Sequence, residues 1–308
     1  MKKIVIGLTL SLVLMLSACS TYQEVSVNEK NNTRVITTEQ AGELEVPLEV
    51  KRGVMFRATD PLNAHLLGVE PISVNEILKN NKYINENLKD ITFIKPGDLN
   101  ALKRLNPDLI ITYAPDEYAS EYQKIAPTIE VLYNSSFLSP YKKRVYLTHL
   151  YHLGVMLNKE EEAKKKIDEW FQKMTELKRE LKFDATEHNA VILTEIEEGY
   201  QIVPEFASFG SEAVFDVLGF QYNKEAKRLS ENHISTLSNL KELENFDADY
   251  VFINTKDTED KNLKNTVLES TNLKEENIIV LNINDYRTND LISVEAQTRE
   301  IIEQLNEK

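Results

Sequence analysis

The segment from Asn158 to Lys182 constrains the fold of this chain most, because its pattern predicts one uninterrupted amphipathic helix. Its apolar residues recur three and four positions apart, as one stripe of a helix requires: Ala163, Ile167, Trp170, Phe171, Met174, Leu177 and Leu181. Asn158 is a candidate N-cap, with Glu161 reaching back as in a capping box. The helix would be roughly 37 Å long, about the width of a domain. Because strand-rich sequence lies on both sides, we expect residues 158–184 to connect two lobes rigidly.

The first residues are typical of an export signal rather than of a folded domain. Basic Met1-Lys2-Lys3 precedes an apolar run, 4–16, that is too short to span a bilayer comfortably. Leu16-Ser17-Ala18-Cys19 is similar to a bacterial lipobox, so residues 1–18 are the predicted signal peptide and Cys19 the predicted lipidation site. A lipid anchor explains an exported chain with a single cysteine, although an ordinary signal with an incidental cysteine is the alternative. Residues 19–33 are polar without periodicity, and we expect a tether to the extracellular face of the plasma membrane.

Charge and motifs exclude several classes of protein. The formal net charge of −14 makes nucleic acid an unsuitable partner. The sequence holds no Ser-His-Asp order, no glycine-rich phosphate loop and no HExxH pair, so it predicts no enzyme. About 275 residues remain after the signal and tether, enough for one large domain or two lobes.

Alternation of short strands and helices predicts two α/β lobes, residues 34–157 and 185–308. In the first lobe, residues 34–49 are expected to form a hairpin, and buried strands are expected to end just before the loops 57–61, 95–97 and 113–117. Ligands of parallel sheets bind beyond the carboxyl ends of the strands, so these loops should share one face. In the second lobe we expect these elements: strands at 190–194, 250–254 and 278–282, loops at 195–209 and 284–290, and helices at 210–218, 237–245 and 292–305. The expected fold class is therefore α/β, two Rossmann-like lobes joined by a single long backbone helix.

Four motifs in chain order resemble the lipid-anchored substrate-binding proteins that deliver ferric siderophores, haem or cobalamin to ABC importers. They are GELEVP (42–47) leading into RGVMF (52–56), NPDLIITY (106–113), YQKIAPTI (122–129) and GSEAVFDVLG (210–219). The resemblance covers residues 34–308 and implies a non-enzymatic, monomeric receptor that serves the permease subunits of an ABC transporter. The YQKIAPT segment and residues 209–219 look most like binders of ferric hydroxamate siderophores. Those binders carry Trp and Arg just before the glycine of the C-lobe helix, where this chain has Ala207 and Phe209, and a family tyrosine is Gln201 here.

A ferric siderophore brings its metal already saturated, so its receptor offers aromatic faces and hydrogen-bond donors, with no cofactor and no metal ligand of its own. Arg57, in the first loop, and Arg287, after a strand end, are the expected donors; a surface charge is the alternative for each. Large aromatic residues in predicted loops form the expected wall, with lobe packing as the alternative for each: Tyr113, Tyr200, Phe206, Phe209 and Tyr286. The resemblance adds that Tyr286 matches a cleft tyrosine of the family.

Other ligands remain open at this point. A receptor for bare metal would need three or four converging His and carboxylate ligands, and only His149 and His152 are close in sequence; we interpret that pair as helix surface or packing. Haem, cobalamin or another metal chelate would suit the same fold. A surface interaction protein without a small ligand is the alternative from another functional class, and a cleft lined by the named aromatics and an arginine would argue against it.

The resemblance also implies one exposed docking glutamate on each lobe for the permease. In the C-terminal lobe this position falls on Glu242, which we expect to point outward from a helix whose leucines are buried. In the N-terminal lobe it falls on Asn100, which carries no charge. Asp98 lies close by as a substitute, although helix capping explains that aspartate equally well.

Overall fold

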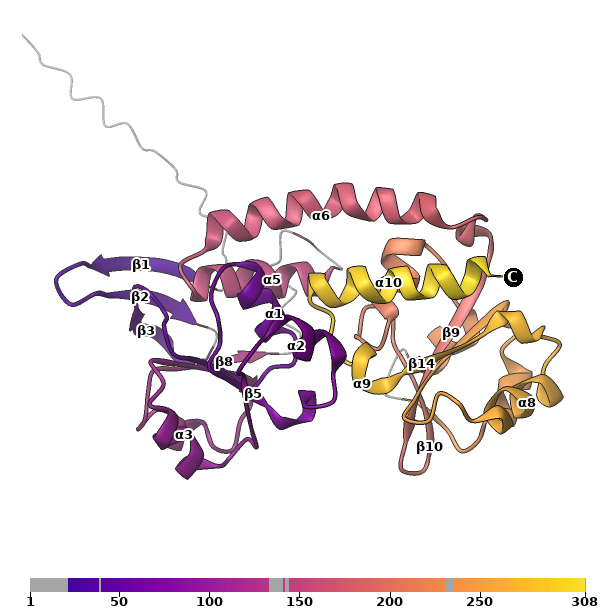
Figure 1. Ribbon diagram of the computed structural model, residues 1–308, viewed down its shortest axis with the longest axis horizontal. Coiled ribbons are helices and arrows are strands. Elements are labelled where there is room, and N and C mark those ends of the chain that lie inside the picture. Colours follow the sequence, from indigo (N-terminus) through magenta and orange to yellow (C-terminus); the bar gives the residue numbers. More distant parts are fainter. Residues whose placement is uncertain (1–21, 39, 133–140, 142–143, 231–234, 308) are drawn as a thin grey trace, which may run out of the picture.

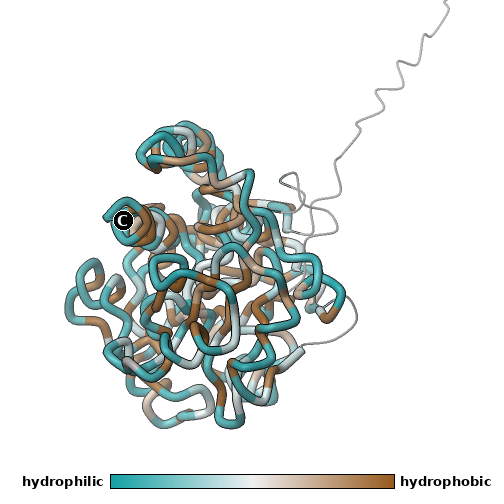
Figure 2. The backbone as a smooth tube through the Cα atoms, turned by 90° about the vertical axis from the view of Figure 1, so that its right-hand side faces the viewer, coloured by the Kyte–Doolittle hydropathy of each residue, from teal (hydrophilic) through white to brown (hydrophobic). Residues whose placement is uncertain are grey.

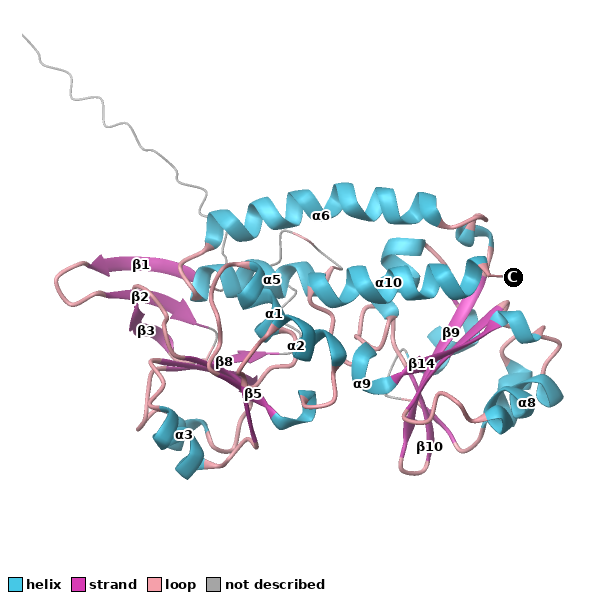
Figure 3. Ribbon diagram, viewed as in Figure 1, coloured by secondary structure: helices cyan, strands magenta, loops and turns pink. Residues whose placement is uncertain are grey.

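Two α/β lobes lie side by side, and one long helix, α6 (Glu160–Glu180), spans both of them (Figure 1). The computed structural model describes residues 22–38, 40–132, 141, 144–230 and 235–307. Each lobe holds a sheet with helices packed around it (Figure 3). The expected fold class, two α/β lobes joined by a long helix, is confirmed.

The sheet of the N-terminal lobe has five parallel strands in the order β6-β5-β4-β7-β8. The strands are β4 (Gly53–Met55), β5 (Ser73–Asn75), β6 (Thr92–Ile94), β7 (Leu109–Ala114) and β8 (Thr128–Leu132). The helices of this lobe are α1 (Asp60–Leu66), η1 (Glu76–Leu78), α2 (Lys82–Asn87), α3 (Leu99–Leu105), α4 (Ala119–Tyr122) and α5 (Val145–Met156). The strand order reverses between β4 and β7, and a crevice forms outside the carboxyl ends of the strands at such a reversal. The loops after β4 and β7 are therefore the ones positioned to meet a ligand.

The sheet of the C-terminal lobe is mixed, in the order β12-β10-β9-β13-β14. Its strands are β9 (Asn189–Ile196), β10 (Gly199–Ile202), β11 (Gln221–Tyr222), β12 (Thr236–Leu237), β13 (Tyr250–Thr255) and β14 (Ile278–Asn282). Its helices are η3 (Ala185–Glu187), η4 (Glu212–Leu218), α7 (Lys224–Ser230), η5 (Leu240–Asn245), α8 (Lys261–Ser270), η6 (Glu275–Asn277), α9 (Ile283–Tyr286) and α10 (Leu291–Asn306). Strands β9, β13 and β14 run parallel, so their carboxyl ends form one edge.

Three expected segments of this lobe differ from the structure. The expected loop 195–209 contains β10, which pairs antiparallel with β9. The expected loop 284–290 begins inside the short helix α9, and the expected helix 237–245 begins as strand β12. In each case the element is only two to four residues long, so it leaves too few residues for a periodic pattern.

The expected tether is wrong from Gln23 onward, because residues 23–28 form strand β1 (Gln23–Asn28) and the next strand begins at Thr33. This strand pairs with β2 (Thr33–Thr38), which pairs in turn with β3 (Gly42–Pro47) as the expected hairpin. All six side chains of β1 are exposed, including Val25 and Val27, so backbone pairing rather than burial of apolar side chains holds the strand. Tyr22 is fully buried, its ring centroid 4.8 Å from that of His152. Cys19 lies outside the described residues, and only Ser20 and Thr21 separate it in sequence from Tyr22.

The sequence predicted that Asn158 caps the start of α6. In the structure Asn158 instead ends α5. Its φ of +58° is left-handed, and its amide donates to Val155 while the Lys159 amide donates to Gly154. These two bonds are those of a Schellman motif, in which asparagine is one of the few residues that replace glycine. The side-chain amide of Asn158 donates to the carbonyl of Leu48, 3.2 Å away. The turn between α5 and α6 is therefore so close that Asn158, which the sequence assigned to the start of α6, belongs to the end of α5.

The apolar stripe of α6 packs on both lobes, and the helix forms the top layer in the end-on view (Figure 2). Five of the seven predicted residues are buried along the helix and Leu181 is buried at its C-cap, but Phe171 is 37% exposed. The indole Nε1 of Trp170 donates to the hydroxyl of Tyr146, 2.9 Å away. Full burial of a large aliphatic side chain contributes about 1.5–3 kcal/mol to the free energy of folding, so Ile167, Met174 and Leu177 together hold α6 firmly on the lobes. None of the helices within the described ranges is long and apolar enough to cross a membrane.

His149 and His152 lie inside this packing, the second of the two expected roles, and not on the helix surface. His152 is 1% exposed between the rings of Tyr22 and Tyr151. Burial lowers the pKa of His152 to about 4, assisted by the charge of Arg57, so its imidazole is neutral at physiological pH.

Candidate functional site

The N-terminal lobe contributes Arg57, in the loop after β4, and Tyr113, near the end of β7. Arg57 is only 1% exposed, so it is not a surface charge. Its Nη1 lies 3.1 Å from Oδ1 of the fully buried Asp60, and its guanidinium stacks on the Tyr113 ring, 5.6 Å from the centroid. Nε and Nη2 of Arg57 have no hydrogen-bond partner within the described part of the chain. Two donors of this guanidinium are thus buried without a partner among the described residues, next to the Tyr113 ring.

Tyr113 lies in the field of both predicted arginines. Burial raises the pKa of its hydroxyl, and the charges of Arg57 and Arg287 partly oppose that shift. The phenol therefore stays protonated at neutral pH and remains a hydrogen-bond donor. Because Arg287 belongs to the other lobe, Tyr113 marks the place where the two lobes meet.

The C-terminal lobe contributes a hollow of about 590 Å³ at the carboxyl ends of β9, β13 and β14. It is lined by Thr194, Glu195, Ile196, Glu197, Gln201, Phe209, Lys256, Ile283 and Arg287. Arg287 follows α9, and its guanidinium lies over the Phe209 ring, 5.6 Å from the centroid. Burial lowers the pKa of Arg287, offset in part by Tyr113. No carboxylate of the described residues forms an ion pair with Arg287, so its positive charge lacks a counter-ion.

Phe209 reaches its place through an unusual backbone. Phe206, Ser208 and Phe209 have φ values of 63°, 64° and 55°, a left-handed conformation that costs of order 1–3 kcal/mol per residue. A buried carboxylate compensates: Glu212 accepts hydrogen bonds from the Ser208 amide, the Ser211 hydroxyl and the Asn289 amide.

The carbonyl of Phe209 itself accepts from Asn254, 3.0 Å away. Burial raises the pKa of the supporting Glu212 carboxylate. The sequence analysis did not predict these hydrogen bonds of Glu212 and Asn254. The one signal in the sequence was Glu212 itself, an acidic residue on the apolar face of residues 210–219.

Four of the seven predicted ligand-binding residues are brought together. Arg57, Tyr113, Arg287 and Phe209 follow one another across the boundary of the lobes as a row of alternating guanidinium groups and rings, which we call the interlobe row. Cations and aromatic faces in this order present donors beside flat apolar surfaces. The interlobe row is the candidate ligand-binding surface.

The other three predicted residues lie elsewhere. Tyr200 lines a second hollow of about 380 Å³ beside the β9–β10 hairpin. Tyr286 is 2% exposed, and its hydroxyl donates to the carbonyl of Gln297 in α10, 3.3 Å away. Phe206 is partly buried and does not line the 590 Å³ hollow. A larger hollow, about 650 Å³, lies at the amino ends of the C-lobe strands, away from the interlobe row.

The predicted docking residues have local structural roles. Glu242 completes a capping box at the start of η5, where its Oε1 accepts from the Ser238 amide, 2.8 Å away. The sequence carries this signal as Asn239 followed three residues later by Glu242, and it was overlooked. Asp98 caps α3 by accepting from the Ala101 amide, which agrees with helix capping as the alternative to a docking role. Asn100 is exposed.

A family model described as "Periplasmic binding protein" matches residues 62–277 of this chain. The "Fe(3+)-citrate-binding protein YfmC" of Bacillus subtilis (strain 168) is 28% identical over 250 residues, 78% of this chain and 75% of that protein. FhuD2 of Staphylococcus aureus, solved with bound ferrioxamine B, superposes with a TM-score of 0.71 at 23% identity, over 83% of this chain and 98% of that one. SirA of Staphylococcus aureus, complexed with staphyloferrin B, gives a TM-score of 0.65 at 23% identity, over 89% and 97% of the two chains. The two solved structures share the fold, and the family match extends over more than half of the chain. The chain therefore belongs to the periplasmic binding protein family, a family of non-enzymatic substrate-binding proteins of transporters.

Proposed function

We propose that this protein captures a ferric siderophore on the interlobe row and delivers it to the permease of an ABC importer. One observation carries the proposal: the guanidinium of Arg287 has no acidic partner in the described structure, lies over an aromatic face of its own lobe and interacts electrostatically with a tyrosine of the other. The names of similar proteins point in the same direction, since they bind ferric citrate, ferrioxamine B and staphyloferrin B.

The chemistry of a ferric chelate suits this arrangement. Its metal is already coordinated, so the receptor needs donors for the outer oxygens and apolar faces for the organic body. Arg287 and the free nitrogens of Arg57 supply donors, and Phe209 and Tyr113 supply the faces. Each charged hydrogen bond formed in this way is worth roughly 1.5–3 kcal/mol.

Two chelate classes compete for this site. A hydroxamate-type siderophore is favoured by the resemblance of the YQKIAPT segment to hydroxamate binders. A carboxylate-type chelate such as ferric citrate is favoured by the uncompensated charge of Arg287 and by the relative named for ferric citrate. Of the two glutamates that line the hollow with Arg287, Glu195 is already engaged, because it accepts from the Thr255 hydroxyl and the Lys256 amide.

Calorimetric titration of the mature protein with ferrioxamine B, ferric citrate, ferric staphyloferrin B, haem and cobalamin tests the proposal. Calorimetry suits the purpose better than tryptophan fluorescence, because Trp170 reports on α6 rather than on the interlobe row. Arg287→Ala and Arg57→Ala should each weaken binding by roughly 1.5–3 kcal/mol, about ten- to a hundredfold. Arg228→Ala, which removes an exposed arginine from α7, is the control and should leave affinity unchanged.

If Arg287→Ala and Arg57→Ala both fold and both keep the wild-type affinity, the binding site lies elsewhere in the protein. Failure of the wild type to bind any chelate of this panel would favour the alternative class, a surface interaction protein without a small ligand.

We also propose that Cys19 carries a lipid that holds the protein on the extracellular face of the plasma membrane. Cys19→Ala should leave an unprocessed precursor or release protein into the medium, because the acyl chains would supply the membrane affinity. Fractionation and lipid labelling of the variant provide the measurement. A variant that stays lipid-labelled at the membrane would show that the lipobox assignment is wrong.

A further inference from the structure

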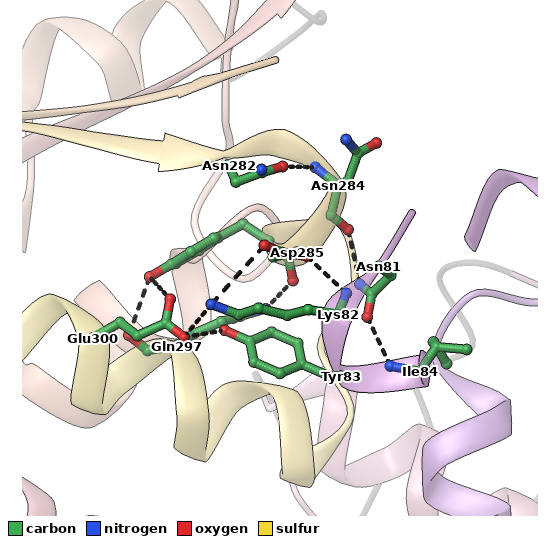
Figure 4. A network of polar contacts seen from close by, with 10 residues as sticks. Asn81, Lys82, Tyr83, Ile84, Asn282, Asn284, Asp285, Gln297 and Glu300 are labelled. Atoms are coloured by element: carbon green, nitrogen blue, oxygen red, sulfur yellow. Dashed lines mark hydrogen bonds and ion pairs between the residues drawn. The ribbon is translucent and has the colours of Figure 1, made fainter. Parts of the chain in front are cut away.

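Besides α6, a polar contact joins the lobes near the interlobe row (Figure 4). Asn81, the N-cap of α2, donates through Nδ2 to the carbonyl of Asn284 in α9, 2.8 Å away. The next amide, that of Lys82, donates to Oδ1 of Asp285 at 2.9 Å. The first turn of an N-lobe helix is thus bonded to a C-lobe helix through two hydrogen bonds that span more than 200 residues of sequence.

Glu300 of α10 completes this contact, together with the phenols of Tyr83 and Tyr286. Glu300 accepts from the Tyr83 hydroxyl at 3.0 Å and lies 2.5 Å from Nζ of Lys82. Its other oxygen accepts from the hydroxyl of Tyr286 at 3.4 Å. We call Asn81, Lys82, Tyr83, Asn284, Asp285 and Glu300 together the α2–α9 contact. Its central members, Asn81, Tyr83 and Asp285, are each less than 10% exposed.

The α2–α9 contact acts directly on the backbone that carries Arg287. Helix α9 has only four residues, and Arg287 is its C-cap. Within those four residues, the Asn284 carbonyl and the Asp285 carboxylate are bound by the N-terminal lobe, and the Tyr286 hydroxyl is bound by α10. Arg287 therefore directly follows a helix, α9, that the N-terminal lobe holds in position.

We propose that Asn81 and its neighbours in the α2–α9 contact are positioning residues for Arg287, so that chelate affinity depends on contact between the lobes. This inference rests on the proposed function. Because coupling between two equilibria is reciprocal, a chelate bound to Arg287 stabilises the contact by the amount that the contact contributes to its binding. A partner that separates the lobes would withdraw Arg287 and lower the affinity for the chelate.

Loss of the α2–α9 contact should leave the protein folded, because other contacts hold the lobes together. Arg144 of the N-terminal lobe donates to Asp216 of η4 at 2.9 Å, and the Tyr146 hydroxyl donates to the same carboxylate at 2.7 Å. The stripe of α6 packs on both lobes in addition. The α2–α9 contact therefore affects the position of α9, and the fold does not depend on it.

Asn81→Asp tests the proposal with little change of shape. Aspartate keeps the oxygen that caps α2 by accepting from the Ile84 amide, but it removes the donor to Asn284 and places a carboxylate near Asp285. Asn85→Asp is the matched control, since it makes the same chemical change at an exposed position of the same helix. Tyr83→Phe, which removes one hydroxyl, is the second variant if Asn81→Asp folds poorly.

Affinity for ferric citrate and ferrioxamine B should fall about tenfold in Asn81→Asp, and stay within about twofold in Asn85→Asp. In an Arg287→Ala background, Asn81→Asp should have almost no further effect, because the group that it positions is gone. A loss that persists in full in that background would overturn the proposal, since the contact would then act independently of Arg287.

A second readout needs no chelate. The Nε–Hε resonance of Arg287 in ¹⁵N-arginine-labelled protein, assigned by its loss in Arg287→Ala, should shift in Asn81→Asp and not in Asn85→Asp. An unchanged resonance in Asn81→Asp would overturn the positioning role even if chelates bind. Failure of the wild type to bind any chelate would instead contradict the proposed function, and the resonance would still decide the positioning role.

Discussion

Asp290 is a buried carboxylate at the N-cap of α10, where its two oxygens accept from the amide and the hydroxyl of Ser293. Burial raises the pKa of Asp290 to about 6. The unfolded chain releases this proton near pH 4 and the folded protein only near pH 6, so the contribution of Asp290 to stability is lost as pH rises through this window. Asp290→Asn keeps an oxygen for the cap and removes the titration. The variant should therefore be more stable than the wild type by roughly 2–3 kcal/mol at pH 7.5 and no more stable near pH 4.

Urea unfolding of both proteins at the two pH values measures this difference. His152 acts in the opposite direction, because its lowered pKa makes stability fall as pH drops from about 6.5 to about 4. The comparison must therefore be between variant and wild type at each pH, rather than along one profile. An equal stability difference at both pH values would contradict the assigned cause.

Helix η5 carries a residue to which structure and family resemblance give different roles. Glu242 caps the helix through hydrogen bonds that need only an oxygen, whereas docking to a permease needs its charge. Glu242→Gln should keep stability and impair uptake if the charge docks. Glu242→Ala should in addition lower the free energy of unfolding by about 0.5–2 kcal/mol through loss of the cap. Uptake at limiting chelate and urea unfolding separate the two roles.

Glu244→Gln, on the exposed side of the same helix, is the matched control for a simple loss of surface charge. Normal uptake by Glu242→Gln would remove Glu242 from the docking surface and leave it a purely structural cap.

The whole molecule should move little when it binds a ligand. Its lobes are joined by the continuous helix α6, by the bonds of Arg144 and Tyr146 to Asp216, and by the α2–α9 contact. Hinge closure of a binding protein needs a few residues that absorb large backbone changes, and a helix held at both ends supplies none. Small-angle scattering profiles with and without chelate should therefore nearly superimpose. A marked compaction on binding would show that α6 bends.

The sequence alone predicted the features whose causes are local. The three- and four-residue spacing in α6 required one buried stripe, Asp98 and the residues after it encoded a cap for α3, and the apolar runs at 109–112 and 278–282 encoded buried strands. Each of these signals lies within a few residues of the structure that it predicts. The two-lobe fold and the arginines of the candidate site followed from such signals together with the family resemblance.

Only the tertiary structure decided features that depend on distant partners. Strand β1 exists because β2 offers a backbone edge, and Asn158 ends α5 because the next helix turns back at that point. Tyr286 lies in the core because α10 supplies partners for its hydroxyl. Arg57 and Tyr113 meet Arg287 and Phe209 only once the two sheets face each other across the lobe boundary. Hydrophobic period and helix caps depend on neighbouring residues, but the meeting of Tyr113 with Arg287 and of Asn81 with Asn284 depends on the packing of segments that the sequence keeps more than 100 residues apart.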